Sequence, residues 1–148
     1  MFEVGRRIGA ATEAGDLIVL DGVLGAGKTT LAQGIGRGLG VRGPITSPTF
    51  VIARVHPSLS RGPDLVHVDA YRLGSLDELD DLDLDASMTE CVTVVEWGKG
   101  LVEVLADEWL QVTIDRSFGT AGDGDESRTV TLLPFGERWA AVLPSLVL

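Results

Sequence analysis

Residues 22–29 read GVLGAGKT, a complete match to the G-x-x-x-x-G-K-T pattern of a phosphate-binding loop. Glycines let successive backbone N–H groups turn toward one anion, the lysine reaches the β- and γ-phosphates, and the final hydroxyl can bind Mg²⁺. The pattern therefore predicts a nucleoside triphosphate site. The residues expected to contact the nucleotide here are Gly25, Ala26, Gly27, Lys28, Thr29 and Thr30.

The sequence on either side of this loop has the expected form. Residues 16–21 (DLIVLD) are a short, largely apolar strand candidate, and residues 30–36 continue as a plausible helix. A strand, a loop and a helix N-terminus are what phosphate binding requires. The alternative is a glycine-rich turn that only connects a strand to a helix, and the complete motif favours the phosphate site.

Length and composition indicate one globular domain, residues 1–148. Hydrophobic residues make up 45% of the chain, yet no apolar run approaches the roughly 18 residues that a membrane span needs. The N-terminal residues do not resemble a secretion signal. One cysteine and two histidines provide neither a disulfide framework nor a convincing zinc site. We therefore expect a soluble, cytoplasmic protein with no membrane association.

The formal net charge is −10. Contacts to phosphates supply most of the affinity of nucleic-acid-binding proteins, so this charge argues against direct binding of DNA or RNA. Much of the charge lies in the alternating acidic and leucine residues of 77–85, which favour a solvated face over a docking site for a basic partner.

The rest of the chain predicts an α/β fold of the P-loop NTPase type, with a mostly parallel central sheet flanked by helices. Helices are expected near residues 1–13 and 75–85, and strands at 50–55, 65–69 and 93–97. The chain after Trp97 is interpreted as strands. Two of these, 110–114 and 128–133, flank the glycine- and aspartate-rich turn 119–126 and predict an antiparallel C-terminal hairpin.

Two carboxylates follow hydrophobic strands and are candidates for catalysis. Asp69 ends the strand LVHVD, the pattern of a Walker-B-type aspartate that holds the metal. Glu96 follows Val94 and Val95, and could position the attacking water as a base or bind the metal. Either carboxylate could instead cap its strand by accepting a backbone hydrogen bond.

A hydroxyl cluster, Thr46, Ser47 and Thr49, follows the first nucleotide helix, where related folds place a segment that senses the γ-phosphate. Ordinary turn chemistry around Pro48 explains it equally well. Trp97 is suited either to the core or to a place beside the nucleotide. The chain contains no asparagine and so lacks the Asn-Lys-x-Asp signature of guanine-specific proteins, which favours ATP.

Four motifs in this order resemble the TsaE (YjeE) family: LGAGKTT at 24–30, SPTF at 47–50, HVDAYRL at 67–73 and VEW at 95–97. The resemblance implies a small ATPase for the bacterial threonylcarbamoyl modification of adenosine-37 in ANN-reading tRNAs. Such a protein works with TsaD and TsaB, does not transfer the group itself, and uses ATP hydrolysis to support repeated turnover. It would meet tRNA only indirectly, which agrees with the acidic charge.

The resemblance also implies roles for single residues. Lys28 would hold phosphates, Thr29 and Glu96 would contact Mg²⁺, and Asp69 would complete the catalytic carboxylates. Residues 47–50 would form the switch segment, while Trp97 with Tyr71 and Arg72 would shape the nucleotide or partner surface. Arg128 is similar to a family arginine near the nucleotide. The full set of nucleotide-binding candidates is Gly25, Ala26, Gly27, Lys28, Thr29, Thr30, Ser47, Thr49, Trp97 and Arg128, with metal candidates Thr29, Asp69 and Glu96.

The chain departs from the family pattern at Val23, where an Asp is common. The family also has a threonine ahead of its first helix that can approach adenine, at about the position of Met1 here. We therefore expect either different adenine contacts or a recorded start that is late.

Two other functions share the phosphate loop. A small-molecule or nucleotide kinase would need an acceptor pocket and usually an arginine-bearing lid, and no such lid is evident in the sequence. An ATP-sensing adaptor that does not hydrolyse ATP would bind a partner only in its nucleotide-bound form.

Overall fold

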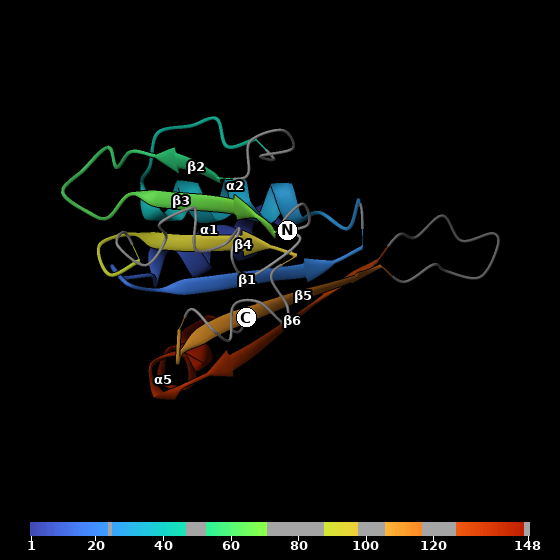
Figure 1. Cartoon of the computed structure of the whole chain (residues 1–148). Coiled ribbons are helices and arrows are strands. Elements are labelled where there is room, and N and C mark those ends of the chain that lie inside the picture. The colour runs from blue at the N-terminus through green and yellow to red at the C-terminus, as the bar shows by residue number, and fades with distance from the viewer. Residues whose placement is uncertain (24, 47–52, 71–87, 98–105, 117–126, 147–148) are drawn as a thin grey trace.

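A sheet of six strands, in the order β2-β3-β4-β1-β5-β6, organises the described part of the chain (Figure 1). The structure is a computed structural model that describes residues 1–23, 25–46, 53–70, 88–97, 106–116 and 127–146. The strands are β1 (Leu17–Gly22), β2 (Ala53–His56), β3 (Leu65–Asp69), β4 (Val92–Glu96), β5 (Trp109–Arg116) and β6 (Arg128–Phe135). The helices are α1 (Phe2–Ala10), α2 (Lys28–Leu39) and α5 (Glu137–Leu146).

The centre of the sheet is parallel and both of its edges are antiparallel. β3, β4, β1 and β5 run in one direction, whereas β2 pairs antiparallel with β3 and β6 antiparallel with β5. The predicted P-loop NTPase-like fold and its antiparallel C-terminal pair are therefore confirmed. This topology brings the carboxyl ends of four strands and the amino end of β6 to one edge of the sheet, where open α/β sheets bind ligands.

The central strands β3 and β4 are buried on both faces of the sheet, which explains their nearly continuous apolar sequences. Alternate residues of the central strands, such as Ile18, Leu20 and Val94, pack with α1, α2 and α5 in one core cluster. The intervening residues, such as Val19, Val68 and Val95, form a second cluster on the opposite face. In Figure 1, α1 and α2 lie together behind the sheet.

Glycines allow α1 and α2 to approach each other closely. A side chain at Gly5 would collide with the Leu31 carbonyl oxygen, and one at Gly34 with the Phe2 carbonyl oxygen. Backbone contact of this kind leaves no room for even one methyl group, so these positions accept only glycine without a shift of the helices. The packing fixes α2, the helix that follows the phosphate loop, against α1.

The interpretation of the chain after Trp97 as strands is wrong at its end, because residues 137–146 form α5. Pro144 lies inside this helix and lacks the N–H that a helix interior uses, which disguises the pattern. Trp139 and Leu146, seven residues apart, are nevertheless buried in the core beside the partly buried Val142. This helical spacing on one face was the signal that could have identified α5.

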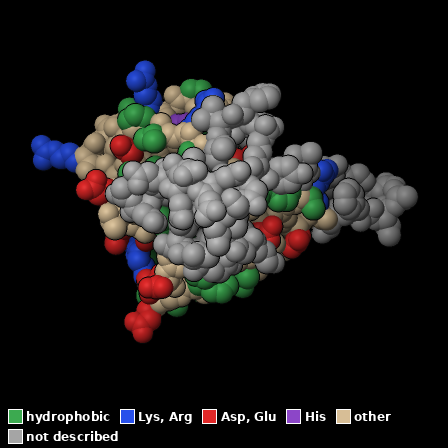
Figure 2. Space-filling view, in the orientation of Figure 1, with side chains coloured by type: hydrophobic (Ala, Val, Ile, Leu, Met, Phe, Trp, Pro, Cys, Tyr) green, Lys and Arg blue, Asp and Glu red, His purple; other side chains and the backbone are tan. Residues whose placement is uncertain are grey.

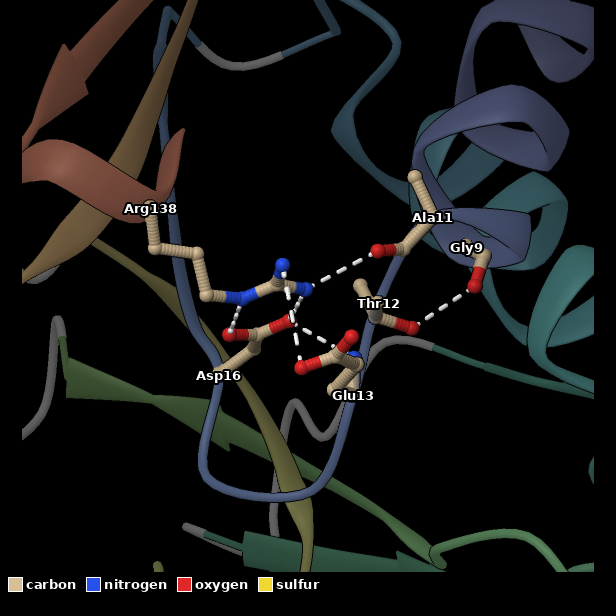
Figure 3. Close-up of polar contacts among 6 residues, drawn as sticks. All are labelled: Gly9, Ala11, Thr12, Glu13, Asp16 and Arg138. Carbon is tan, nitrogen blue, oxygen red and sulfur yellow. Dashed lines mark hydrogen bonds and ion pairs between the residues drawn. The ribbon is translucent and has the colours of Figure 1, made fainter. Parts of the chain in front are cut away.

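An ion pair attaches α5 to the start of β1 (Figure 3). Arg138 donates from Nε to Oδ1 of Asp16 at 2.7 Å and from Nη2 to Oδ2 at 2.6 Å. Nη2 also donates to the Ala11 carbonyl at 3.0 Å, and the backbone N–H of Glu13 donates to Asp16 at 2.7 Å. We call Arg138, Asp16 and these two backbone partners the basal clamp, because they lie at the amino end of the parallel strands.

Several predicted elements differ in extent from the structure. The N-terminal helix predicted near residues 1–13 ends at Ala10, and the strand predicted at 50–55 is described from Ala53 and ends at His56. The predicted helix at 75–85 and the turn at 119–126 lie outside the described residues. Cys91 is a partly buried free thiol that packs against the second core cluster, as expected of a packing residue.

The charged residues are scattered on the face shown in Figure 2. Among the side chains coloured there, basic groups lie apart from one another and do not form a continuous area. This face therefore offers no broad basic surface among the described residues. Within the described ranges, none of the helices combines the length and the apolar character required to span a bilayer.

Candidate nucleotide site

The loop between β1 and α2 has the backbone conformation of a phosphate-binding loop. Gly25 and Gly27 have φ angles of 78° and 113°, in the left-handed region that glycine adopts without steric cost. The N–H of Ala26 donates to the Val23 carbonyl at 3.0 Å, which closes the turn. α2 begins directly afterwards at Lys28, so the free N–H groups of its first turn lie beside the loop. This arrangement suits an anion.

Lys28 is buried and folded back on the loop. Its Nζ donates to the carbonyl oxygens of Gly22 at 2.7 Å and Val23 at 3.0 Å. Burial lowers the pKa of Lys28, although the charges of Glu96, Asp21 and Asp69 oppose this shift. A buried ammonium whose hydrogen bonds go to neutral carbonyls gains from a nearby anion, so phosphate oxygens are suitable partners for this side chain.

Asp69 and Glu96 lie side by side at the ends of two neighbouring strands. They are register partners in the parallel pairing of β3 with β4, and both are buried. Alternation along β4 places Glu96 on the same face as Val94, the face that α2 covers. The structure thus brings together the two carboxylates that the sequence singled out, close enough to Lys28 for their charges to affect its pKa.

The fit of these residues to Mg²⁺ depends on the ligand type. Hydroxyl and carboxylate oxygens are hard ligands, and nucleotide-bound Mg²⁺ usually takes only one or two protein ligands together with phosphates and waters. Among the described residues, no three side chains of His, Cys, Asp or Glu form a metal cluster of their own. Thr29, in the first turn of α2, and the two carboxylates are therefore compatible with a metal held mainly by a nucleotide.

Trp97 lies against Lys28. The lysine Nζ is 4.4 Å from the centroid of the indole ring, a distance typical of a cation–π contact. The backbone of Trp97 has a φ of 60°, unusual for a large side chain, while its N–H donates to the Leu20 carbonyl at 3.3 Å. Strained backbone of this kind occurs often at functional sites. Of the two sequence interpretations, the position beside the phosphate loop agrees with this geometry.

Two arginines lie over the glycines of the loop. A Cβ atom placed on Gly27 would be 3.3 Å from Nη1 of Arg128, and one on Gly25 would be 3.5 Å from Nη1 of Arg116. The arginines are register partners at the ends of β5 and β6. Sequence reasoning selected Arg128 only through the family resemblance and missed Arg116. Arg116 lies shortly after the predicted strand 110–114, but it is the pairing of β5 with β1 that brings it to the loop.

The hydroxyl cluster is described only in part. Thr46 accepts a hydrogen bond from Nη1 of Arg54 at 3.3 Å, and the Ile45 carbonyl accepts one from Nε2 of Gln33, on α2, at 3.0 Å. These contacts attach the residues before 47–52 to α2 and β2. Ser47 and Thr49, as well as Tyr71 and Arg72, lie outside the described residues.

Comparison with known proteins identifies the family. The family model described as threonylcarbamoyl adenosine biosynthesis protein TsaE matches residues 1–122. The chain belongs to the TsaE family. It is 62% identical to the tRNA threonylcarbamoyladenosine biosynthesis protein TsaE of Streptomyces coelicolor over 141 residues, which cover 95% of this chain and 94% of the relative. It is 35% identical to the TsaE of Bacillus subtilis over 144 residues, 97% of this chain and 85% of that protein.

A solved structure shares the fold as well. The crystal structure of YdiB from Bacillus subtilis superposes with a TM-score of 0.73 at 31% identity, covering 98% of this chain and 85% of that one. The resemblance drawn from the four sequence motifs is thus confirmed. The role of this TsaE family is in the biosynthesis of threonylcarbamoyladenosine in tRNA.

Proposed function

We propose that this TsaE family member is an Mg²⁺-dependent ATPase that binds the TsaD–TsaB pair and supports repeated rounds of threonylcarbamoylation of adenosine-37 in ANN-reading tRNAs. It does not itself transfer the threonylcarbamoyl group. The observation that carries the proposal is the meeting of Lys28, Asp69 and Glu96 at a phosphate loop in one buried corner of the sheet.

Each side chain has a separate task in this proposal. Lys28 leaves the carbonyls of Gly22 and Val23 for the β- and γ-phosphates, and Arg128 and Arg116 add positive charge beside the loop. Thr29, Asp69 and Glu96 are the residues that would hold Mg²⁺, which neutralises developing phosphate charge when bound. Glu96 either positions the attacking water as a base or belongs to the metal ligands.

The acidic charge of the chain supports indirect contact with tRNA. At a net charge of −10, phosphate backbones are repelled at long range, whereas a protein partner can bring the ATPase to the modification complex. A cytoplasmic location is part of the proposal, because the family acts in the biosynthesis of a tRNA modification.

Glu96→Gln tests the ATPase proposal directly. The substitution keeps the size of the side chain and removes its negative charge, so we expect ATP turnover to fall about 100-fold or more while ATP binding remains. The measurement is phosphate release with Mg²⁺, alone and with TsaD, TsaB, tRNA and threonylcarbamoyl-adenylate. Glu90→Gln is a matched control, because this exposed glutamate lies just before the opposite end of β4.

The same experiment separates the alternatives. Turnover that rises with the partners and accompanies multiple rounds of tRNA modification supports the proposal. Unchanged turnover in Glu96→Gln contradicts a catalytic role for this carboxylate. ATP binding without turnover by the wild-type protein, even with the partners, favours the adaptor, whereas phosphate appearing on a small-molecule acceptor favours the kinase.

A further inference from the structure

His67 is a completely buried side chain directly behind the catalytic corner. It lies on β3 between Leu65, a member of the first core cluster, and Asp69. Because side chains alternate along a strand, all three residues are on the face that α2 covers. Across the parallel pairing, His67 lies opposite Val94, two residues before Glu96.

The ring of His67 lies beside the carboxylate of Glu96. Nε2 of His67 is 3.2 Å from Oε2 of Glu96, and both side chains are almost fully shielded from solvent. The ring nitrogens nevertheless have no hydrogen bond that meets angular criteria within the described part of the chain. The two groups are therefore in contact at hydrogen-bonding distance, but the ring N–H is not aligned with the oxygen.

A structural role alone explains this residue poorly. Burying a polar ring without a well-formed hydrogen bond costs stability, and an apolar side chain would fill the same space beside Leu65 and Val94 without that cost. This loss of stability is understandable if the imidazole ring has a functional role toward the neighbouring Glu96. Groups that touch a catalytic or metal-binding carboxylate from behind commonly hold it in the orientation that function requires.

We propose that His67 is a positioning residue for Glu96: the imidazole holds Oε2 at the back of the corner and so leaves Oε1 for the side on which Lys28 and the phosphate loop lie. The inference rests on the proposed ATPase function. It adds a residue that the nucleotide does not touch, and it explains how a glutamate with three rotatable side-chain bonds keeps one orientation at the end of a strand.

Three variants measure this role through turnover. His67→Leu fills the volume and removes both nitrogens, and we expect kcat for ATP hydrolysis to fall about 10- to 100-fold with KM for ATP within about twofold of wild type. His67→Gln returns one N–H donor near the position of Nε2, and is expected to recover part of kcat. His56→Gln is the control, because His56 is also buried but lies opposite Leu65, at the end of β3 remote from Asp69.

Loss of folding is distinguished from loss of positioning by thermal unfolding of each variant. If His67→Leu lowers the melting temperature but keeps the wild-type kcat, the positioning role is overturned. Equal kcat values for His67→Gln and His67→Leu, both far below wild type, also contradict the positioning role. That role predicts that the hydrogen-bonding side chain of Gln recovers part of the activity.

A second measurement does not depend on ATP hydrolysis. The chain has two histidines, so their ring nitrogens give two sets of NMR signals. Glu96→Gln should move the signals of His67 clearly and those of His56 little. Wild-type protein that hydrolyses no ATP under any condition refutes the proposed function, while the spectra still decide the His67–Glu96 contact: unchanged His67 signals overturn it.

Discussion

The two edges of the parallel sheet use charged residues in opposite ways. At the amino edge, the basal clamp joins Arg138 to Asp16 through two short, directed hydrogen bonds. At the carboxyl edge, Lys28 donates hydrogen bonds to two neutral carbonyls, and His67 lies 3.2 Å from Glu96 without a directed hydrogen bond. One edge is complete in the free protein, whereas the groups at the other are suited to phosphates.

The difference indicates where stability and function reside. A buried ion pair with directed hydrogen bonds is destabilising to break, since the remaining charge stays buried without a partner. Buried polar groups with poor partners reduce stability and are retained where they bind or react. Substitutions at the two edges should therefore separate activity from stability, and the predictions below test this separation.

The largest effect is expected for Lys28→Ala, which removes the ammonium from the phosphate loop. ATP turnover should fall by at least about 100-fold, because a positioned cation stabilises the developing phosphate charge. Thermal unfolding should change little or shift upward, since burial already lowers the pKa of Lys28 and so disfavours its charged form. Phosphate release and a melting curve measure the two properties.

Arg37→Ala is the matched control, because Arg37 is an exposed cation in the last turn of the same helix. Its turnover should equal that of wild type. A large loss of stability in Lys28→Ala would break the comparison, because it would give the carboxyl edge the structural role assigned to the clamp.

The sequence predicted the functional residues at the carboxyl edge more fully than the clamp at the amino edge. Strands β1, β3 and β4 are short apolar runs that end at or beside the candidate residues, so both the mostly parallel sheet and the choice of Asp69 and Glu96 as candidates could be predicted. Local patterns carry that information because strand ends converge at one edge. The loop glycines, with their positive φ angles, were equally evident from the motif.

The missed features depend on contacts between distant residues. Arg138 and Asp16 are 122 positions apart, and no local pattern relates them. Pro144 obscured the helix that carries Arg138. Arg116 approaches Gly25 only because β5 pairs with β1, and the contact of His67 with Glu96 depends on the pairing of β3 with β4. These are tertiary facts that composition and periodicity do not contain.

The second-largest effect is expected for Arg138→Ala and concerns the free energy of unfolding. Arg138→Ala should lower the free energy of unfolding by about 2–3 kcal/mol, because it leaves the Asp16 carboxylate buried with fewer partners. This corresponds to a melting temperature roughly 5–10 °C lower. ATP turnover, measured well below that temperature, should stay within about twofold of wild type, because the clamp lies at the edge opposite the phosphate loop.

Two further arginine variants sharpen this result. Arg138→Lys should recover only part of the stability, since an ammonium cannot make the paired hydrogen bonds of a guanidinium to one carboxylate. Arg7→Ala removes a partly exposed arginine whose Nε lies 3.5 Å from Oε1 of Glu3, and its effect should stay below about 1 kcal/mol. An Arg138→Ala protein as stable as wild type contradicts the structural role of the clamp.

The smallest effect is expected for Arg128→Ala, which removes a cation beside Gly27. A charge-assisted hydrogen bond to phosphate contributes about 1.5–3 kcal/mol, so KM for ATP should rise about 10-fold or more. Arg116→Ala should raise KM in the same direction, because its Nη1 lies equally near the loop at Gly25.

The melting temperature of Arg128→Ala is a second test of the carboxyl edge. Arg128 and Arg116 are cross-strand partners, and like charges in this position are mutually destabilising. Removing Arg128 should therefore leave the melting temperature unchanged or raise it, the reverse of Arg138→Ala. A nucleotide phosphate would gain a charge-assisted contact from Arg128, so ATP should raise the melting temperature of wild type more than that of Arg128→Ala. Equal shifts with ATP would mean that Arg128 does not contact the phosphates.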